Sequence, residues 1–332
     1  GVPVAKMSGR GLGFTGGTID KLGAIPGFQT AVEEQDFIDQ VNEKGIAVIG
    51  QTGHIAPADK KIYALRDVTA TVDNLSLITS SVMSKKLASG SDAILLDVKC
   101  GNGAFMQTKE EAEKLARLMV KIGRAHGKKT MAVISDMNQP LGCAIGNALE
   151  VKEAIEVLRG NGPEDISELS ATLAGMMAYL GEKAATPEEG IAMAKKKIAD
   201  GSALQKFRDM VESQGGDPRI IEDTALLPQA EAELAFLADR DGCIEEIHAR
   251  KMGLASQHTG AGRERKEDEI DLAAGILLYK KVGDFVQKGD VICKIYGKNI
   301  KKLEKALEEI KNAVKISENP VNCNSLIHEV IQ

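Results

Sequence analysis

Residues 5–28 read AKMSGRGLGFTGGTIDKLGAIPGF, a glycine-rich stretch that directly follows a short apolar run. Glycines let the backbone take positive φ and approach a ligand closely, so that successive N–H groups can converge on an anion. The hydroxyls of Ser8 and Thr18 and the cations of Lys6 and Arg10 accompany these glycines. A flexible surface turn is the alternative, but a linker would lack the preceding strand and the Pro-Gly stop. The stretch is therefore predicted to bind phosphate.

Two common phosphate motifs were compared with this stretch. Gly11, Gly13 and Gly16 match the dinucleotide pattern G-x-G-x-x-G, and acidic residues follow from Glu33 onward. A dinucleotide loop should open a long helix, whereas only residues 18–22 can be helical before glycine and proline interrupt them. The pattern G-x-x-x-x-G-K-[ST] is absent from the chain. The sequence thus indicates a phosphate cradle of another kind.

Three segments together carry a family resemblance. The quoted stretch, IGQTGHIAPADKKIYALRDVTATV at residues 49–72 and SSVMSKKLA at residues 80–88 resemble the pyrimidine nucleoside phosphorylase and thymidine phosphorylase family. The resemblance extends over the whole chain. Phe14 stands where many members carry histidine, so no catalytic role is assigned to it.

The resemblance implies an enzyme, a pentosyltransferase that reversibly phosphorolyses pyrimidine nucleosides. Uridine, thymidine or deoxyuridine would react with inorganic phosphate, the co-substrate, to give free base and a pentose 1-phosphate. No organic cofactor is implied, and family members are homodimers. The runs KMSGRG and QPLGCAIGNALEVKE are more similar to the broad pyrimidine enzymes than to strict thymidine phosphorylases, which remain an alternative. Anthranilate phosphoribosyltransferases, the nearest other chemistry, use acidic motifs that are not found in this chain.

The apolar pattern predicts an α/β fold. Short runs rich in valine, isoleucine and leucine alternate with amphipathic helical stretches, which favours a mainly parallel sheet flanked by helices. Thr108 and Glu111 form a capping-box pattern before one helix, and Gly123 is expected to end it. The predicted strands are residues 2–8, 45–50, 92–98 and 129–135, and the predicted helical regions are residues 59–66, 72–88 and 146–212.

Beyond a turn-rich break at residues 215–218 the chain changes to short β-like segments. Residues 275–295 carry K-x-G-D-x-V-x-x-G-D, which resembles the hammerhead of biotinyl and lipoyl carriers. The pairs Gly283-Asp284 and Gly289-Asp290 predict tight turns. No modifiable lysine stands at the expected spacing, so a structural β region is favoured over a carrier. A charged amphipathic helix is predicted at residues 299–314.

The resemblance implies three regions. Residues 1–57 and 89–215 would form an α/β phosphate-binding domain similar to glycosyltransferase family 3. Residues 58–88 would belong to an all-helical lobe that carries base-binding residues. Residues 216–332 would form a C-terminal α+β domain of pyrimidine nucleoside phosphorylase type, part of it hammerhead-like.

Arg66, Ser81 and Lys85 are the residues that the resemblance places on the pyrimidine base. Ser81 and Lys85 are four apart, so on one helix they share a face. Two cations and a hydroxyl complement the O2, N3 and O4 edge of a pyrimidine, because charged donors bind more strongly as the base leaves with negative charge. Lys86 points about 100° away on an ideal helix. It is therefore given no equivalent role.

Phosphate and cation ligands are also implied by the resemblance. Phosphate contacts fall on Lys6, Ser8 and Thr18, with Met7 contributing backbone only. Leu141 and Ala144 would offer carbonyl oxygens, and Glu153 a carboxylate, to a monovalent cation, potassium; oxygen donors suit such hard ions. Glu153 as an ordinary helix glutamate remains the alternative.

Composition restricts the classes of partner. The net charge is 42 − 48 = −6, without a basic block, which argues against nucleic acid. No apolar run reaches the roughly 20 residues of a membrane span, and no signal peptide is seen. The five cysteines are dispersed, so free thiols and a cytoplasmic location are expected. No i, i+4 histidine pair suggests zinc.

The chain begins with Gly1, which feeds directly into the first predicted strand. Relatives carry an upstream loop of the form K-H-S-T-G-G and most of a helical lobe, so a preceding segment is expected. A second hypothesis follows from that expectation. The chain would then bind phosphate or nucleoside, or serve in assembly, without turnover.

Overall fold

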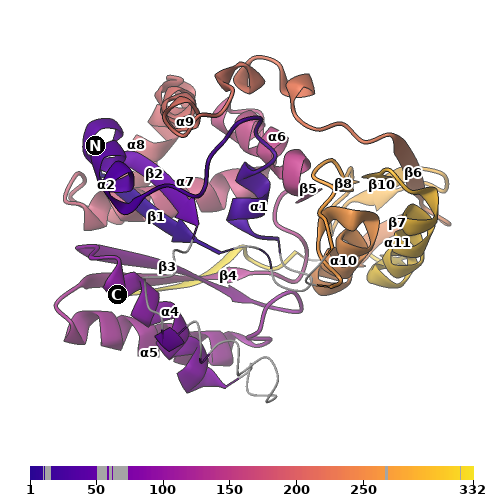
Figure 1. The fold of residues 1–332 in the computed structure, drawn as a ribbon. Helices are drawn as coiled ribbons and strands as arrows, with labels where there is room; N and C mark the ends of the chain where they lie inside the picture. The colour runs from indigo at the N-terminus through magenta and orange to yellow at the C-terminus, as the bar shows by residue number, and fades with distance from the viewer. Residues whose placement is uncertain are drawn as a thin grey trace.

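The computed structural model describes the chain apart from residues 10, 12–15, 51–57, 60–61, 63–73, 266–267 and 322 (Figure 1). Helices and strands alternate through the first two thirds, and a strand-rich part follows. The first elements are β1 (Val4–Ser8), α1 (Thr18–Leu22), α2 (Glu34–Lys44), β2 (Ile46–Gly50), α4 (Leu75–Ala88), β3 (Ala93–Cys100), α5 (Lys109–Ala125), β4 (Lys129–Asp136) and β5 (Ala144–Gly146). The helices α6 (Asn147–Leu158), α7 (Glu164–Leu180), α8 (Pro187–Ala199) and α9 (Ser202–Ser213) come next.

The strand-rich part begins after two short 3-10 turns, Pro218–Ile221 and Thr224–Leu226. It consists of β6 (Ala232–Leu237), β7 (Gly242–Ile247), α10 (Ala249–Ser256), β8 (Gly275–Leu278), β9 (Phe285–Val286), β10 (Val291–Gly297), α11 (Ile300–Ala313), β11 (Val314–Ser317) and β12 (Ile327–Ile331). A short π-helical turn, Gln257–Ala261, follows α10. Within the described residues no helix is long and apolar enough to cross a membrane.

The strands of the α/β part form two ladders. β1 pairs with β2 and β3 pairs with β4, both parallel, and β12 is antiparallel on the other side of β4. Figure 1 shows these strands between α4 and α5 on one side and α6 to α9 on the other. The sequence therefore predicted the mixed α/β fold correctly. Its four apolar runs pair in parallel, but in two separate ladders rather than in one sheet.

β12 has no counterpart in the sequence-based prediction. It lies at the end of the region that was assigned to the C-terminal domain, yet it completes the ladder of β3 and β4. Ile331 is buried with β3 and α5, and Glu329 pairs with Arg117 at 3.0 Å. A strand that pairs across about two hundred residues leaves no local sign of its partner. The division at residue 216 remains a prediction, and this returning strand was not part of it.

The helices begin where the capping residues predict. Thr108 and Glu111 make the full capping box of α5, and Thr186 caps α8 with proline at its first position. Gly123 does not end α5, contrary to expectation, because the helix continues to Ala125. Gly123 packs against Thr130, and a Cβ there would overlap the threonine hydroxyl. Its role is close helix–strand contact.

α4 lies against the α/β part. It packs on α5, and Met83 is buried in the same cluster as Ile94 and Leu115. Of the range 58–88 that was expected in a separate lobe, this described portion is in direct contact with the α/β core. The assignment of the whole range to a lobe remains a prediction.

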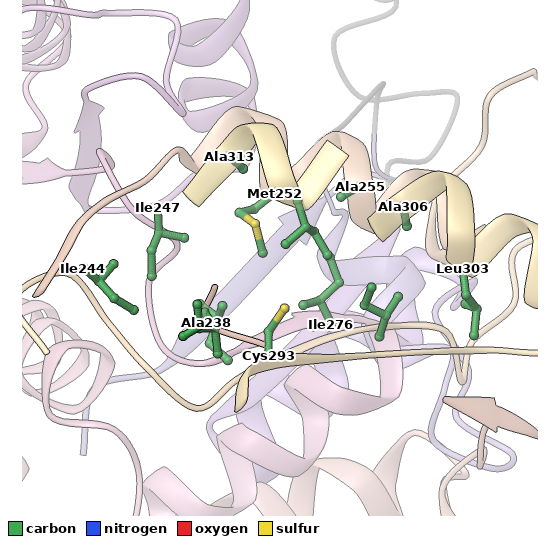
Figure 2. Close-up of a cluster of buried hydrophobic side chains, with 14 of the residues drawn as sticks. Ala238, Ile244, Ile247, Met252, Ala255, Ile276, Cys293, Leu303, Ala306 and Ala313 are labelled. Atoms are coloured by element: carbon green, nitrogen blue, oxygen red, sulfur yellow. The ribbon is translucent and has the colours of Figure 1, made fainter. Parts of the chain in front are cut away.

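The C-terminal part has two small sheets, with strand orders β5-β8-β10-β6 and β11-β7-β9. β5 comes from the α/β part, between β4 and α6, so the two parts share a strand. Helices α10 and α11 cover a core that includes Met252, Ile276 and Leu303 (Figure 2). Gly283 and Gly289 both have φ of 94°, as the predicted turns require. The hammerhead likeness itself stays an expectation.

Gln214, at the end of α9, covers the free edge of β2. Its Oε1 accepts from Val48 N at 3.0 Å, and its Nε2 donates to Val48 O and Gln29 O, both at 2.8 Å. The residue is only 3% exposed. An amide side chain therefore supplies the hydrogen bonds that a further strand would supply, which keeps the edge from being unpaired.

Replacing Gln214 with alanine is expected to lower the free energy of unfolding by about 2–4 kcal/mol, because the buried N–H and C=O groups of Val48 lose their partners. Chemical denaturation measures the change. Gln205→Ala, an exposed change on the same helix, is the control and should stay within about 0.5 kcal/mol. Equal losses in the two variants would contradict the role assigned to Gln214.

Candidate functional site

The described part of the glycine-rich stretch connects β1 to the short helix α1. Gly11 N donates to Asp20 Oδ2 at 2.6 Å, and Asp20 is 9% exposed. Arg263, from the C-terminal part, approaches the other oxygen of this carboxylate at 3.4 Å. Gly11 is thus held by a buried aspartate of α1. Arg10 lies outside the described residues.

Lys6, Met7 and Ser8 form the end of β1, and Thr18 is the first residue of α1. The cap of α1 is Gly17, without a side-chain hydrogen bond, so the Thr18 hydroxyl is not used in capping. Burial lowers the pKa of Lys6, and Lys21 of α1 lowers it further. The four predicted phosphate residues lie on β1 and α1, which are consecutive elements of the chain.

Lys6 and Lys86 form a pair of unneutralised cations. Burial lowers the pKa of Lys6, with a further contribution from Lys21, although part of the Lys6 side chain is open to solvent. Burial also lowers the pKa of Lys86, followed by repulsion from Lys6 and Lys85. Within the described part of the chain neither ammonium has a hydrogen bond or ion pair. Partly desolvated cations without a counter-ion favour binding of an anion beside them.

Sequence analysis gave Lys86 no role. Its angle on the helix differs from that of Lys85, and the charge of Lys6 on β1 contributes to lowering its pKa, after burial. The adjacent lysine pair at positions 85 and 86 was the available signal. Which lysine faces β1 depends on how α4 packs, which the sequence does not show.

Ser81 and Lys85 share a face of α4, as predicted. Lys85 Nζ donates to Ser81 Oγ at 3.0 Å and pairs with Asp59 Oδ2 at 2.8 Å. The Asp59 side chain is only 10% exposed, and sequence analysis gave it no role. Arg66, the third predicted base-binding residue, lies outside the described residues. The structure therefore shows a hydroxyl, a cation and a buried carboxylate in contact.

Glu153 of α6 holds the segment before β5. Its Oε1 accepts from Cys143 N at 2.7 Å and from Ala144 N at 3.0 Å, and the side chain is buried. Burial raises the pKa of Glu153, opposed by these two hydrogen bonds, while Glu150 and Asp165 raise it further. Gly142, with φ of 69°, lies so close to this carboxylate that a Cβ would overlap it.

These surroundings fit a cation. Glu153 has no ion pair with any described cation, and a positive charge would offset its desolvation. Leu141 and Ala144, the other two predicted ligands, lie on the same segment. Among the described residues no group of three histidine, cysteine or acidic side chains could hold a metal. A buried carboxylate beside a backbone segment suits a hard monovalent ion better than a transition metal.

Glu153→Gln is expected to change the pH dependence of stability. With its pKa raised, folded Glu153 binds more protons than unfolded Glu153 just above pH 4.5, so its contribution to stability falls as pH rises through that window. Glutamine keeps the oxygen acceptor but cannot titrate. Denaturation in potassium-free buffers at several pH values should show this fall in wild type and not in the variant. Glu168→Gln, at an exposed position on α7, is the control; a curve for Glu153→Gln identical to wild type would contradict the assignment.

Comparison with known proteins extends over the whole chain. The profile of the glycosyl transferase family, a/b domain, matches residues 1–204, and that of the pyrimidine nucleoside phosphorylase C-terminal domain matches residues 243–317. A pyrimidine-nucleoside phosphorylase of Geobacillus stearothermophilus is 54% identical over 331 residues, which are 100% of this chain and 76% of that protein. The enzyme of the same name from Staphylococcus haemolyticus is 53% identical over the same shares. That from Staphylococcus aureus strain bovine RF122 is 52% identical over 330 residues, 99% of this chain and 76% of the relative.

Proposed function

The chain belongs to the pyrimidine-nucleoside phosphorylase family, and on that premise we propose that it phosphorolyses pyrimidine nucleosides. The reaction moves a pentosyl group from the base to inorganic phosphate and yields free base and a pentose 1-phosphate. The enzyme is thus a pentosyltransferase with phosphate as co-substrate and no organic cofactor. Uridine, thymidine and deoxyuridine are the proposed nucleosides.

The observation that carries this proposal is the pair of unneutralised lysines, Lys6 and Lys86. Burial is the main cause of the lowered pKa of both lysines, and the charge of Lys6 adds repulsion to Lys86. A phosphate dianion between them would offset that repulsion, and the glycine-rich stretch supplies backbone N–H groups beside it. We propose that Met7, Ser8 and Thr18 complete this phosphate site.

The base would bind at α4. Lys85 and Ser81 provide a charged and a neutral donor for the oxygens and N3 of a pyrimidine, and Arg66 is proposed to add a second cation. Negative charge grows on the base as the glycosidic bond breaks, so these hydrogen bonds strengthen most in the transition state. Asp59 holds the Lys85 ammonium at 2.8 Å and so orients it.

Leu141, Ala144 and Glu153 are proposed to bind potassium. The ion would supply the positive charge that the buried Glu153 lacks among the described residues. A homodimer in the cytoplasm is also proposed; the five free cysteines support a reducing compartment. The division into residues 1–57 with 89–215, 58–88 and 216–332 belongs to the same proposal.

Release of free base from nucleoside in the presence and absence of phosphate tests the reaction. The proposal expects uracil from uridine, or thymine from thymidine, only when phosphate is present, together with an equal amount of pentose 1-phosphate. Base release that does not require phosphate, or no release from any of the three nucleosides, would overturn it.

The variants Lys85→Ala and Lys86→Ala should affect the kinetics of the two substrates differently. Loss of Lys85 removes a charged donor to the departing base and should lower kcat/KM for the nucleoside by about 10- to 100-fold. Loss of Lys86 should mainly raise KM for phosphate, by about 10-fold. Steady-state kinetics with each substrate varied in turn measure both effects, and the exposed Lys121→Ala is the control. The same pattern in both variants would show that the lysines do not face different substrates.

A further inference from the structure

We propose that Lys281 is a built-in cation that fixes the segment from Pro140 to Ala144. Its Nζ donates to Pro140 O and, at 2.7 Å, to Gly142 O, and it pairs with Asp165 Oδ2 at 2.9 Å. Two carbonyls and a carboxylate are the donor types that a bound monovalent ion would take. In this structure the ammonium of Lys281 contacts these three groups instead.

Gly142 is enclosed by these contacts. Its N–H donates to Asp165 Oδ2 at 3.1 Å and its carbonyl accepts from Lys281, while Glu153 lies against its Cα. The next two N–H groups along the chain donate to Glu153. Lys281 and Glu153 therefore hold the same turn from two sides. If Lys281 is removed, the turn loses both carbonyl partners and the charge that balances Asp165.

Two similar turns, at residues 281–284 and 287–290, show that the turn at Lys281 does not itself need a lysine. In the first turn Lys281 N donates to Asp284 Oδ2 at 2.8 Å, and in the second turn Gln287 N donates to Asp290 Oδ2 at 3.0 Å. Both turns contain a glycine with φ of 94°. Glutamine serves as well as lysine in this backbone role. The Lys281 side chain is thus free to act elsewhere, and it contacts the segment before β5.

The charges around this segment are consistent with the clamp. Lys281 pairs with Asp165 at 2.9 Å, whereas Glu153 accepts the N–H groups of Cys143 and Ala144. Because Lys281 pairs with Asp165, Glu153 is left without a described counter-ion, and the proposed potassium would bind there. Lys281 accordingly connects the C-terminal part to the cation ligands as a positioning residue.

This inference goes beyond the proposed reaction and can fail independently of it, since its first test measures stability. Lys281→Met keeps the length of the side chain and removes its charge. The variant should melt about 3 °C or more below wild type. Lys280→Met is the matched control, because Lys280 is its neighbour and only approaches Asp290 at 3.9 Å. Equal melting temperatures for the two variants would overturn the inference.

A second measurement separates the clamp from general packing. Potassium should raise the melting temperature of Lys281→Met more than that of wild type or Lys280→Met, while choline at the same ionic strength should not. In a double-mutant cycle with Asp165→Asn, the decreases in melting temperature of the two single variants should not add, because each substitution removes the same ion pair. Additive losses, or equal responses to potassium in all variants, would show that Lys281 only fills space.

Discussion

The buried carboxylate of Glu153 is the contact on which both parts of the molecule depend. It accepts the N–H groups of Cys143 and Ala144, and so it fixes the segment that becomes β5. β5 in turn pairs with β8 of the C-terminal sheet. A charge that is costly to bury therefore sets the position of a strand that the two parts share. Lys281 reaches the same segment from the C-terminal side.

The candidate site is governed by a different constraint, the repulsion between lysines. Lys85 has Asp59 and Ser81 as partners, whereas Lys86 faces Lys6. Positive charge is therefore balanced at Lys85, on the proposed side of the base, and unbalanced at Lys86, on the proposed side of phosphate. This asymmetry suits a reaction in which one substrate arrives as an anion and the other becomes one. β1 and α4 come from separate segments of the chain, so this charge asymmetry arises only when the two elements pack together.

Local patterns predicted the elements well. The apolar runs became β1 to β4, and the Thr108 and Thr186 caps begin helices as expected. Spacing along α4 placed Ser81 beside Lys85. Two features are long-range: β12, which the sequence did not indicate, pairs with β4, and Gly123, which was expected to end α5, lies inside it and packs against Thr130. Neither feature has a cause within its own stretch of sequence.

The sequence by itself determined the family, the fold class and the residue types at each half of the site, because these follow from motifs and from periodicity along one segment. Only the tertiary structure decided which charges meet. It paired Lys85 with Asp59, turned Lys86 towards Lys6 and brought Lys281 to the carbonyls of Pro140 and Gly142. Electrostatic interactions depend on distance and desolvation, and residues far apart in the chain acquire both only when it folds.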